Sequence, residues 1–183
     1  MKTTKAWSES PMRQWRGDSP HLWDLRSACI GNALDLLKDA RILFSNRRYA
    51  RAFALAFTAY EEFGKAQIVS DFITGVCSRT EFDEAFRRHD LKSSYNKRKI
   101  AINSDRSKPP TVEYDTKDNE SLFKMRMNSL YVDCGDEYKP LTPKARITSP
   151  IARQAIQQVN DYISRILQME AFAERIGTEA LAK

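Results

Sequence analysis

Residues 52–65 read AFALAFTAYEEFGK, a stretch in which alanine and aromatic side chains surround a helix axis on nearly every side. A surface helix keeps one polar face, so this segment is predicted to be the central helix of a bundle. The stretch nevertheless contains Glu61, Glu62 and Lys65, and burying such charges costs several kcal/mol per ion unless they are paired. They form either a partly buried ion cluster or the wall of a polar cleft. On an exposed helix, Glu61 and Lys65 would instead be an ordinary i,i+4 pair worth only ~0.2–0.5 kcal/mol.

The central helix is predicted to occupy residues 49–74 and to end at Gly75, because glycine commonly follows a helix C-terminus. Before it, Ser19-Pro20 is a plausible N-cap and first-turn pair for a helix that runs to residue 46 with apolar residues at helical spacing. Only a short basic turn, residues 46–48, separates the two. They are therefore expected to form an antiparallel hairpin.

A third helix is predicted from residue 80 to residue 102. Thr80 and Asp83 have the spacing of a capping box, with Asp in place of the usual Glu. Residues 103–118 contain Pro109-Pro110 and many polar side chains, so they are predicted to form a loop.

A short helix is predicted over residues 119–128, followed by two very short strands, 130–133 and 138–140, around a turn. Ser149-Pro150 begins the last helix, which is expected to end before Gly177. The predicted fold is all-α, an antiparallel bundle of four to five helices with a small β-hairpin or extended excursion near residues 130–140.

The composition favours one domain, since 183 residues with 42% hydrophobic side chains can form one proper core but hardly two. The bundle domain is assigned to residues 19–177, with a flexible extension at 1–18 and a tail at 178–183. The sequence has neither a run of about 18 uncharged apolar residues nor a signal peptide pattern, so a cytoplasmic protein without membrane contact is expected. The three cysteines are widely spaced and are interpreted as reduced, structural thiols.

The net charge of +6 is concentrated in one segment. Residues 87–108 contain eight basic and two acidic side chains, a net charge of +6, with Tyr95 among them. Such a patch is typical of a surface that binds a phosphate backbone. A solvated basic face that only aids solubility explains the charge equally well.

His89 is the histidine that we single out, because it lies on the predicted third helix between apolar residues on one side and Lys92 on the other. Histidines at such positions are often structural. Here the adjacent Arg88 and the following Lys92 would favour the neutral imidazole, which is the form that acts as a general base.

Arg126 and Tyr131 belong to a segment, residues 123–133, in which polar and apolar groups alternate unlike plain surface. The planar guanidinium of Arg126 could hold two phosphate oxygens at once. Tyr131 could stack on a base or donate a hydrogen bond. As an alternative, both are ordinary surface or packing residues.

Several other chemistries lack their motifs. A di-iron bundle needs Glu-x-x-His pairs, and neither Glu61 nor Glu62 has a histidine three residues later, so no metal ligands are assigned. Glycine-rich phosphate loops and a Gly-x-Ser-x-Gly elbow are also missing from the sequence, and no cofactor is expected.

In order and spacing, four pieces of the chain resemble the AbiV-type abortive-infection family of bacterial phage-resistance proteins. They are Arg51–Tyr60 running into Glu61-Glu62-Phe63-Gly64-Lys65, then Arg88-His89-x-x-Lys92, then Arg126 to Tyr131-Val132-Asp133, and then Pro140. That family is similar to the HEPN superfamily, whose members are helical bundles, often dimeric and in many defence systems metal-independent ribonucleases. The resemblance implies a HEPN-like fold, a role in arresting growth or translation of infected cells, a homodimer, and a phage-encoded activator.

The sequence departs from the familiar HEPN nuclease signature, an Arg followed by four to six residues and a His. Arg126 is followed by Tyr131 at that spacing, and His89 has no arginine at the required distance before it. The resemblance therefore supports the fold and the defence role better than it supports cleavage of RNA.

If the protein is a ribonuclease, two sets of residues are expected to act. The predicted catalytic residues are His89, Arg126, Glu61 and Lys65. The predicted residues for binding RNA or a nucleotide are Glu62, Arg88, Lys92 and Tyr131. Two other interpretations remain open: a binding module that senses a phage protein or nucleotide and acts by sequestration, and a buried polar network that only stabilises the bundle.

Overall fold

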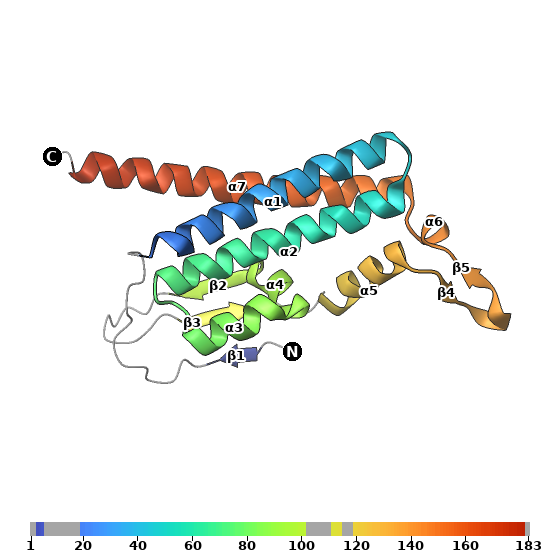
Figure 1. Cartoon of the computed structure of the whole chain (residues 1–183), viewed down its shortest axis with the longest axis horizontal. Coiled ribbons are helices and arrows are strands. Elements are labelled where there is room, and N and C mark those ends of the chain that lie inside the picture. The colour runs from blue at the N-terminus through green and yellow to red at the C-terminus, as the bar shows by residue number, and fades with distance from the viewer. Residues whose placement is uncertain (1–2, 6–18, 102–110, 115–118, 182–183) are drawn as a thin grey trace.

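Three long helices form the body of the protein. The computed structural model describes residues 3–5, 19–101, 111–114 and 119–181. Within these ranges, α1 (Pro20–Ser45), α2 (Tyr49–Ile73) and α7 (Ser149–Leu181) lie side by side, and α2 contacts both of the others (Figure 1). The predicted all-α class is confirmed, and so is the antiparallel hairpin of the first two helices.

Helix α2 is the central helix, as the sequence predicted. Its alanines Ala52, Ala56 and Ala59 are fully buried and pack into one core cluster with residues of α1 and α7. Small side chains at successive turns let helices approach closely, while Phe63 fills the same cluster. Other parts of the protein therefore cover α2 on most of its sides. A charged side chain on this helix is shielded from water and needs an oppositely charged or hydrogen-bonding partner.

The ends of α1 and α2 also agree with the sequence. Pro20 begins α1 directly after Ser19, and α2 runs from Tyr49 to Ile73. Gly75 then adopts a φ of 72°, the left-handed conformation that favours glycine at a helix end.

The predicted third helix, residues 80–102, is wrong as a single element. The chain forms α3 (Arg79–Arg87) and α4 (His89–Tyr95), with Arg88 extended between them, and continues as strand β2 (Arg98–Ala101). The capping box lies two residues earlier than predicted. Ser78 Oγ accepts a hydrogen bond from Glu81 N at 3.3 Å, and Glu81 Oε2 accepts one from Ser78 N at 2.9 Å. The predicted partner Asp83 instead accepts a hydrogen bond from Arg79 Nε at 3.0 Å.

Replacing Ser78 with alanine is expected to lower the free energy of unfolding by about 1 kcal/mol, the usual cost of losing an N-cap. The matched control is Thr80→Ala, at an exposed position in the same helix. Urea unfolding of both variants would measure the effects. An equal or larger loss for Thr80→Ala would contradict the position of the capping box.

Two small sheets flank the bundle. Strand β3 (Thr111–Tyr114) pairs antiparallel with β2 on one side and with β1 (Thr3–Lys5) on the other. The prediction of a loop over residues 103–118 is therefore wrong at β3, where the β-branched and aromatic residues of Thr-Val-Glu-Tyr outweigh the preceding prolines. The rest of that loop, residues 1–2 and 6–18 of the N-terminal extension, and the side chains of residues 90 and 98–108 in the basic segment lie outside the description.

The predicted hairpin near residues 130–140 is confirmed. Helix α5 (Asn119–Leu130) leads into β4 (Asp133–Cys134), which pairs antiparallel with β5 (Pro140–Leu141), and α6 (Pro143–Arg146) follows. Figure 1 shows these elements together at one end of the bundle. Helix α7 begins at Ser149, as predicted, but it continues past Gly177 to Leu181, four residues into the predicted tail. None of the described helices combines the length and the apolar character needed to cross a bilayer.

Candidate functional site

The carboxylate of Glu61 joins three helices. Glu61 lies on α2 and is only 3% exposed. Its Oε1 is 3.1 Å from Nδ1 of His89, the first residue of α4, and its Oε2 is 3.5 Å from Nη1 of Arg126 on α5. We call these three residues, together with Lys92, Glu62 and Lys65, the charged cluster.

The contact with Glu61 fixes which nitrogen of His89 is available for chemistry. An ionised carboxylate can only accept hydrogen bonds, so Nδ1 of His89 must carry the proton that it donates to Glu61. The other nitrogen, Nε2, is then the one with a free lone pair when the imidazole is neutral. Because the His89 side chain is 53% exposed, a ligand can reach it. The sequence suggested cations as the main neighbours of His89, whereas the structure puts a carboxylate in contact with it.

Arg126 is held between Glu61 and an aromatic ring. Its side chain is 18% exposed, and its guanidinium carbon lies 5.8 Å from the centroid of Phe57. Among the described residues, its buried Nε has no hydrogen-bond partner. Arg126 thus has a donor to spare beside the carboxylate that orients it, which suits the binding of an anion.

Lys92 is a buried cation one turn after His89 on α4. It is 6% exposed, and within the described part of the chain its ammonium makes no hydrogen bond or ion pair. Burial lowers the pKa of Lys92, the positive charges of Lys65 and Arg126 lower it as well, and the carboxylates of Glu61 and Glu62 raise it. A lysine with a lowered pKa gives up a proton more readily than an exposed one.

Replacing Lys92 with methionine is expected to raise the free energy of unfolding by about 1 kcal/mol near neutral pH, because it removes a buried charge and keeps most of the volume. The folded-state pKa lies below the ordinary 10.5, so the folded protein carries an unfavourable charge at every pH below that lowered pKa. As the pH rises through the lowered pKa towards 10.5, the folded state loses this proton before the unfolded state does, and the penalty disappears.

Urea unfolding at several pH values would measure the difference in stability between the wild type and Lys92→Met. It should be largest near neutral pH and shrink as the pH approaches 10.5. The control is Lys124→Met, at an exposed position of α5, which should show no such trend. A variant that is less stable than the wild type at every pH would contradict the unfavourable charge.

Glu62 and Lys65 form a second ion pair on α2. Lys65 Nζ donates a hydrogen bond to Glu62 Oε1, and their side chains are only 22% and 15% exposed. The Lys65 ammonium also lies 5.7 Å from the ring centroid of Phe86. The i,i+4 pairing of Glu61 with Lys65 is therefore wrong, since Lys65 pairs at i,i+3. The partly buried ion cluster, the first of the sequence interpretations, is what the structure contains.

Two predicted substrate-binding residues lie at the surface. The Arg88 side chain is 53% exposed and its Nη1 lies 2.9 Å from Glu84 Oε1. Tyr131 is 59% exposed and follows the last turn of α5. The prediction that they bind substrate rests on their proximity along the chain to His89 and Arg126.

Gly64 lets α4 approach the backbone of α2. A Cβ added at Gly64 would lie 2.1 Å from the backbone oxygen of Lys92 and 3.2 Å from Nδ2 of Asn96. Asn96 Nδ2 in turn donates a hydrogen bond to the backbone oxygen of Tyr60 at 2.6 Å. This contact brings Lys92 and His89 to Glu61. Neither this role of Gly64 nor the contact of Asn96 was predicted from the sequence, because both depend on how α4 packs on α2.

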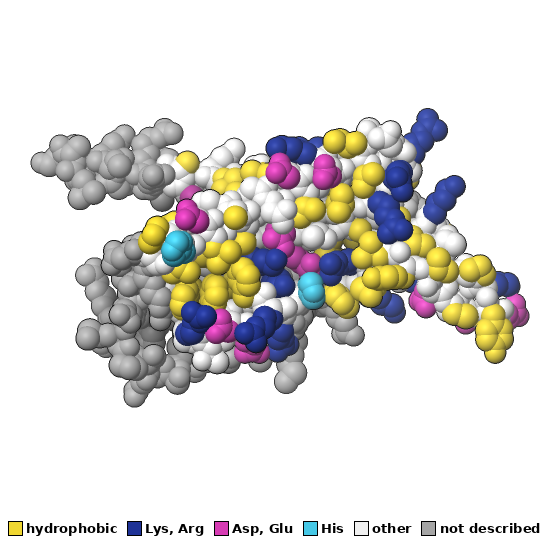
Figure 2. All heavy atoms as spheres, viewed as in Figure 1, with side chains coloured by type: hydrophobic (Ala, Val, Ile, Leu, Met, Phe, Trp, Pro, Cys, Tyr) yellow, Lys and Arg dark blue, Asp and Glu magenta, His cyan; other side chains and the backbone are white. Residues whose placement is uncertain are grey.

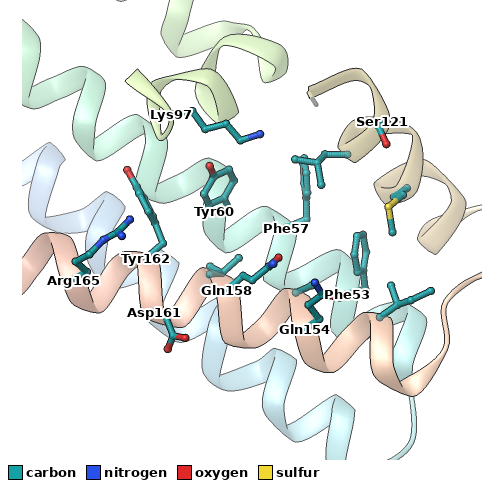
Figure 3. Close-up of a pocket in the computed structure, with 15 residues that line it drawn as sticks. Phe53, Phe57, Tyr60, Lys97, Ser121, Gln154, Gln158, Asp161, Tyr162 and Arg165 are labelled. Carbon is teal, nitrogen blue, oxygen red and sulfur yellow. The ribbon is translucent and has the colours of Figure 1, made fainter. Parts of the chain in front are cut away.

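A groove that the sequence did not reveal lies next to the charged cluster. It has a volume of about 830 Å³ and is walled mainly by α2, α5 and α7 (Figure 3). Phe57 lines the groove, and its ring also contacts the guanidinium of Arg126. The groove and the cluster are therefore neighbours.

On the face shown in Figure 2, acidic, basic and histidine side chains gather in the middle, with apolar surface on both sides. Within the described residues, no three His, Cys, Asp or Glu side chains are grouped so as to hold a metal ion. The chemistry available from these residues is proton transfer at His89 and stabilisation of an anion by Arg126 and Lys92.

An all-α bundle of this kind fits the HEPN-like class of proteins. The comparison with family models identifies the branch. The chain belongs to the HEPN_AbiV family, whose model, described as AbiV, matches residues 21–164. The resemblance seen in the sequence is confirmed, and the family places the chain in abortive infection, a form of phage defence. No curated protein and no solved structure matched the chain.

Proposed function

We propose that the chain serves phage defence as a metal-independent endoribonuclease that arrests translation and growth in infected cells. The observation that carries the proposal is the contact of one buried carboxylate with both His89 and Arg126. A structural network would not need an exposed imidazole whose free nitrogen faces away from its partner.

The first step is removal of a proton from a ribose 2′-hydroxyl by Nε2 of His89. The 2′-oxygen attacks the neighbouring phosphorus, the new O2′–P bond forms, and the P–O5′ bond breaks. The products are a 2′,3′-cyclic phosphate and a 5′-hydroxyl. Glu61 orients the imidazole, because its Oε1 lies 3.1 Å from Nδ1 and leaves Nε2 for the substrate.

The cations of the cluster stabilise the negative charge that develops on the phosphate oxygens. Arg126 offers the part of its guanidinium that remains exposed beside Glu61, and Lys92 offers an ammonium without a partner in the described chain. Because its pKa is lowered, Lys92 is also suited to give the leaving 5′-oxygen its proton. Lys65, held by Glu62, adds positive charge, and the exposed Arg88 and Tyr131 contact the flanking RNA.

The altered order of residues does not oppose this function. In the familiar signature the arginine precedes the histidine by a few residues, whereas here His89 and Arg126 come from different helices. Glu61 brings both to one place through its two oxygens. Geometry at the site decides whether the two groups can act together, and sequence order does not.

The test is incubation of the purified protein with total bacterial RNA and with tRNA, with and without EDTA, and with and without lysate of phage-infected cells. We expect cleavage that resists EDTA. The infected-cell lysate is included because we also propose, from the family, that a phage-encoded protein activates the chain. No cleavage under any of these conditions would contradict the ribonuclease proposal and favour a binding module.

The binding module is the second candidate, and the groove beside the cluster favours it. Such a module would capture a nucleotide or a phage protein and act by sequestration, without proton transfer at His89. We further propose that the working form is a homodimer. Light scattering of the purified protein would measure its mass, and a monomeric mass in the active sample would contradict the dimer.

A further inference from the structure

We infer that the groove between α2, α5 and α7 binds an unpaired nucleobase of single-stranded RNA and thereby places the next phosphate at the charged cluster. This inference rests on the proposed ribonuclease function and names the substrate's conformation. The groove has the size of a small-molecule site, since its volume of about 830 Å³ lies within the usual range of roughly 300–1,000 Å³.

Aromatic rings form the inner wall of the groove. Phe53, Phe57 and Tyr60 come from successive turns of α2, and Tyr162 faces them from α7 (Figure 3). The rings of Tyr60 and Tyr162 meet edge to face, with centroids 5.6 Å apart. Stacking on aromatic rings is the usual way in which proteins hold single-stranded bases, because every base has a π-face.

Hydrogen-bonding groups stand around these rings. Gln154 and Gln158 lie one turn apart on α7 and line the groove, so their amides can both donate to and accept from base edges. Burial raises the pKa of the Tyr60 hydroxyl, as does the nearby Tyr162, so this hydroxyl keeps its proton and remains a donor. A nucleobase requires this mixture of donors and acceptors above an apolar floor.

The charges at the rim match a phosphate backbone. Arg165 of α7 and Lys97, two residues after the end of α4, line the groove, and the guanidinium of Arg165 lies 5.8 Å from the ring centroid of Tyr162. The lining residues include one carboxylate, Asp161, which points away from the rings in Figure 3 and accepts a hydrogen bond from Asn160 at 3.2 Å. Positive charge therefore prevails where a backbone would enter.

Phe57 connects the groove with the charged cluster. Its side chain lines the groove, and the guanidinium of Arg126 lies 5.8 Å from the centroid of its ring. A base stacked in the groove would therefore have its attached phosphate within the surroundings of Arg126. Double-stranded RNA, whose bases are paired and stacked, cannot enter in this way.

The experiment measures binding by the full chain carrying His89→Gln, so that cleavage does not consume the probe. The probe is a fluorescent single-stranded RNA of about 10 nucleotides, within the ~4–16 nucleotide range of single-strand sites. Gln158→Glu and Arg165→Gln are added one at a time. Gln157→Glu and Arg153→Gln are their matched controls, because they make the same charge changes on the same helix outside the groove.

We expect each groove variant to weaken binding by about 5- to 100-fold and each control by less than about twofold, given what one base contact is usually worth. An oligomer of equal charge that lacks bases should bind more weakly by a similar factor. Thermal unfolding of each variant shows whether it is folded. Equal losses in groove and control variants, or equal binding of the oligomer without bases, would overturn the inference.

The outcomes separate the groove from the ribonuclease proposal. If RNA binds through the groove but the wild type cleaves no RNA, the groove inference is supported and the ribonuclease proposal is contradicted. Cleavage is measured with the same groove substitutions made in the wild-type chain, where His89 is intact. If the wild type cleaves RNA and these substitutions leave both binding and cleavage normal, the ribonuclease proposal holds and the groove inference is wrong. It is also wrong if the groove variants change the mass of the protein and leave RNA binding unchanged, since the groove would then hold a second copy.

Discussion

Replacing His89 with glutamine is expected to slow RNA cleavage by about 10²–10⁴-fold, the usual contribution of a general base. Glutamine can still donate a hydrogen bond to Glu61, but it cannot take a proton from a ribose hydroxyl near neutral pH. Because the His89 side chain is 53% exposed, the free energy of unfolding should change by less than about 0.5 kcal/mol. Cleavage of labelled tRNA, followed by gel electrophoresis in the presence of EDTA, would measure the rate.

His21 provides the matched control, since it is the other of the two histidines and lies exposed near the start of α1. His21→Gln should cleave RNA at the wild-type rate. If His89→Gln also kept that rate while remaining folded, His89 would have no part in proton transfer and the mechanism proposed above would be wrong.

Replacing Gly64 with alanine is expected to damage both stability and activity. The added Cβ would lie 2.1 Å from a backbone oxygen, that of Lys92, which can move only if α4 moves with it. Overpacking of this kind usually costs about 1–3 kcal/mol. Because α4 carries His89 and Lys92, its displacement from Glu61 should also lower the cleavage rate of the fraction that remains folded.

The control for this substitution is Gly31→Ala in α1, where an added Cβ meets nothing within 4 Å. That change should stabilise the protein by about 0.5–1 kcal/mol, because alanine favours a helix more than glycine does. Urea unfolding of both variants would measure the difference. A Gly64→Ala protein as stable as the wild type would show that α4 does not pack against α2 as closely as described.

The central helix could be predicted because its signal is local and strong. Residues 52–60 are apolar on nearly every side of the helix, so the helix must be buried, whichever elements pack against it. Gly75 indicates where the helix ends, because glycine readily adopts the left-handed conformation found there. The break at Arg88 could not be predicted in the same way. Ser78 and Glu81 offer a capping box as good as the one expected at Thr80, and the packing of α4 on α2 ends the preceding helix.

The members of the charged cluster could be chosen from the sequence, but their partners could not. Glu61 and His89 are 28 residues apart, so their contact depends on how α4 packs on α2. On a helix, residues at i and i+4 often pair, which suggested Lys65 as the partner of Glu61. In the structure the Glu61 carboxylate instead contacts His89 on α4 and Arg126 on α5. The groove is formed by residues from α2, α5 and α7 together, so no local sequence pattern in any one of these helices predicts it.

The most direct test of a metal-independent ribonuclease is the chemical identity of the RNA ends that the wild-type protein produces in EDTA. Attack by the 2′-hydroxyl leaves a 2′,3′-cyclic phosphate on one product and a 5′-hydroxyl on the other. We expect these ends, which can be identified by mass spectrometry of a short cleaved RNA, and we expect them to be lost with His89→Gln. Ends with a 3′-hydroxyl and a 5′-phosphate would mean that water is the nucleophile, and they would contradict the roles proposed for His89, Arg126 and Lys92.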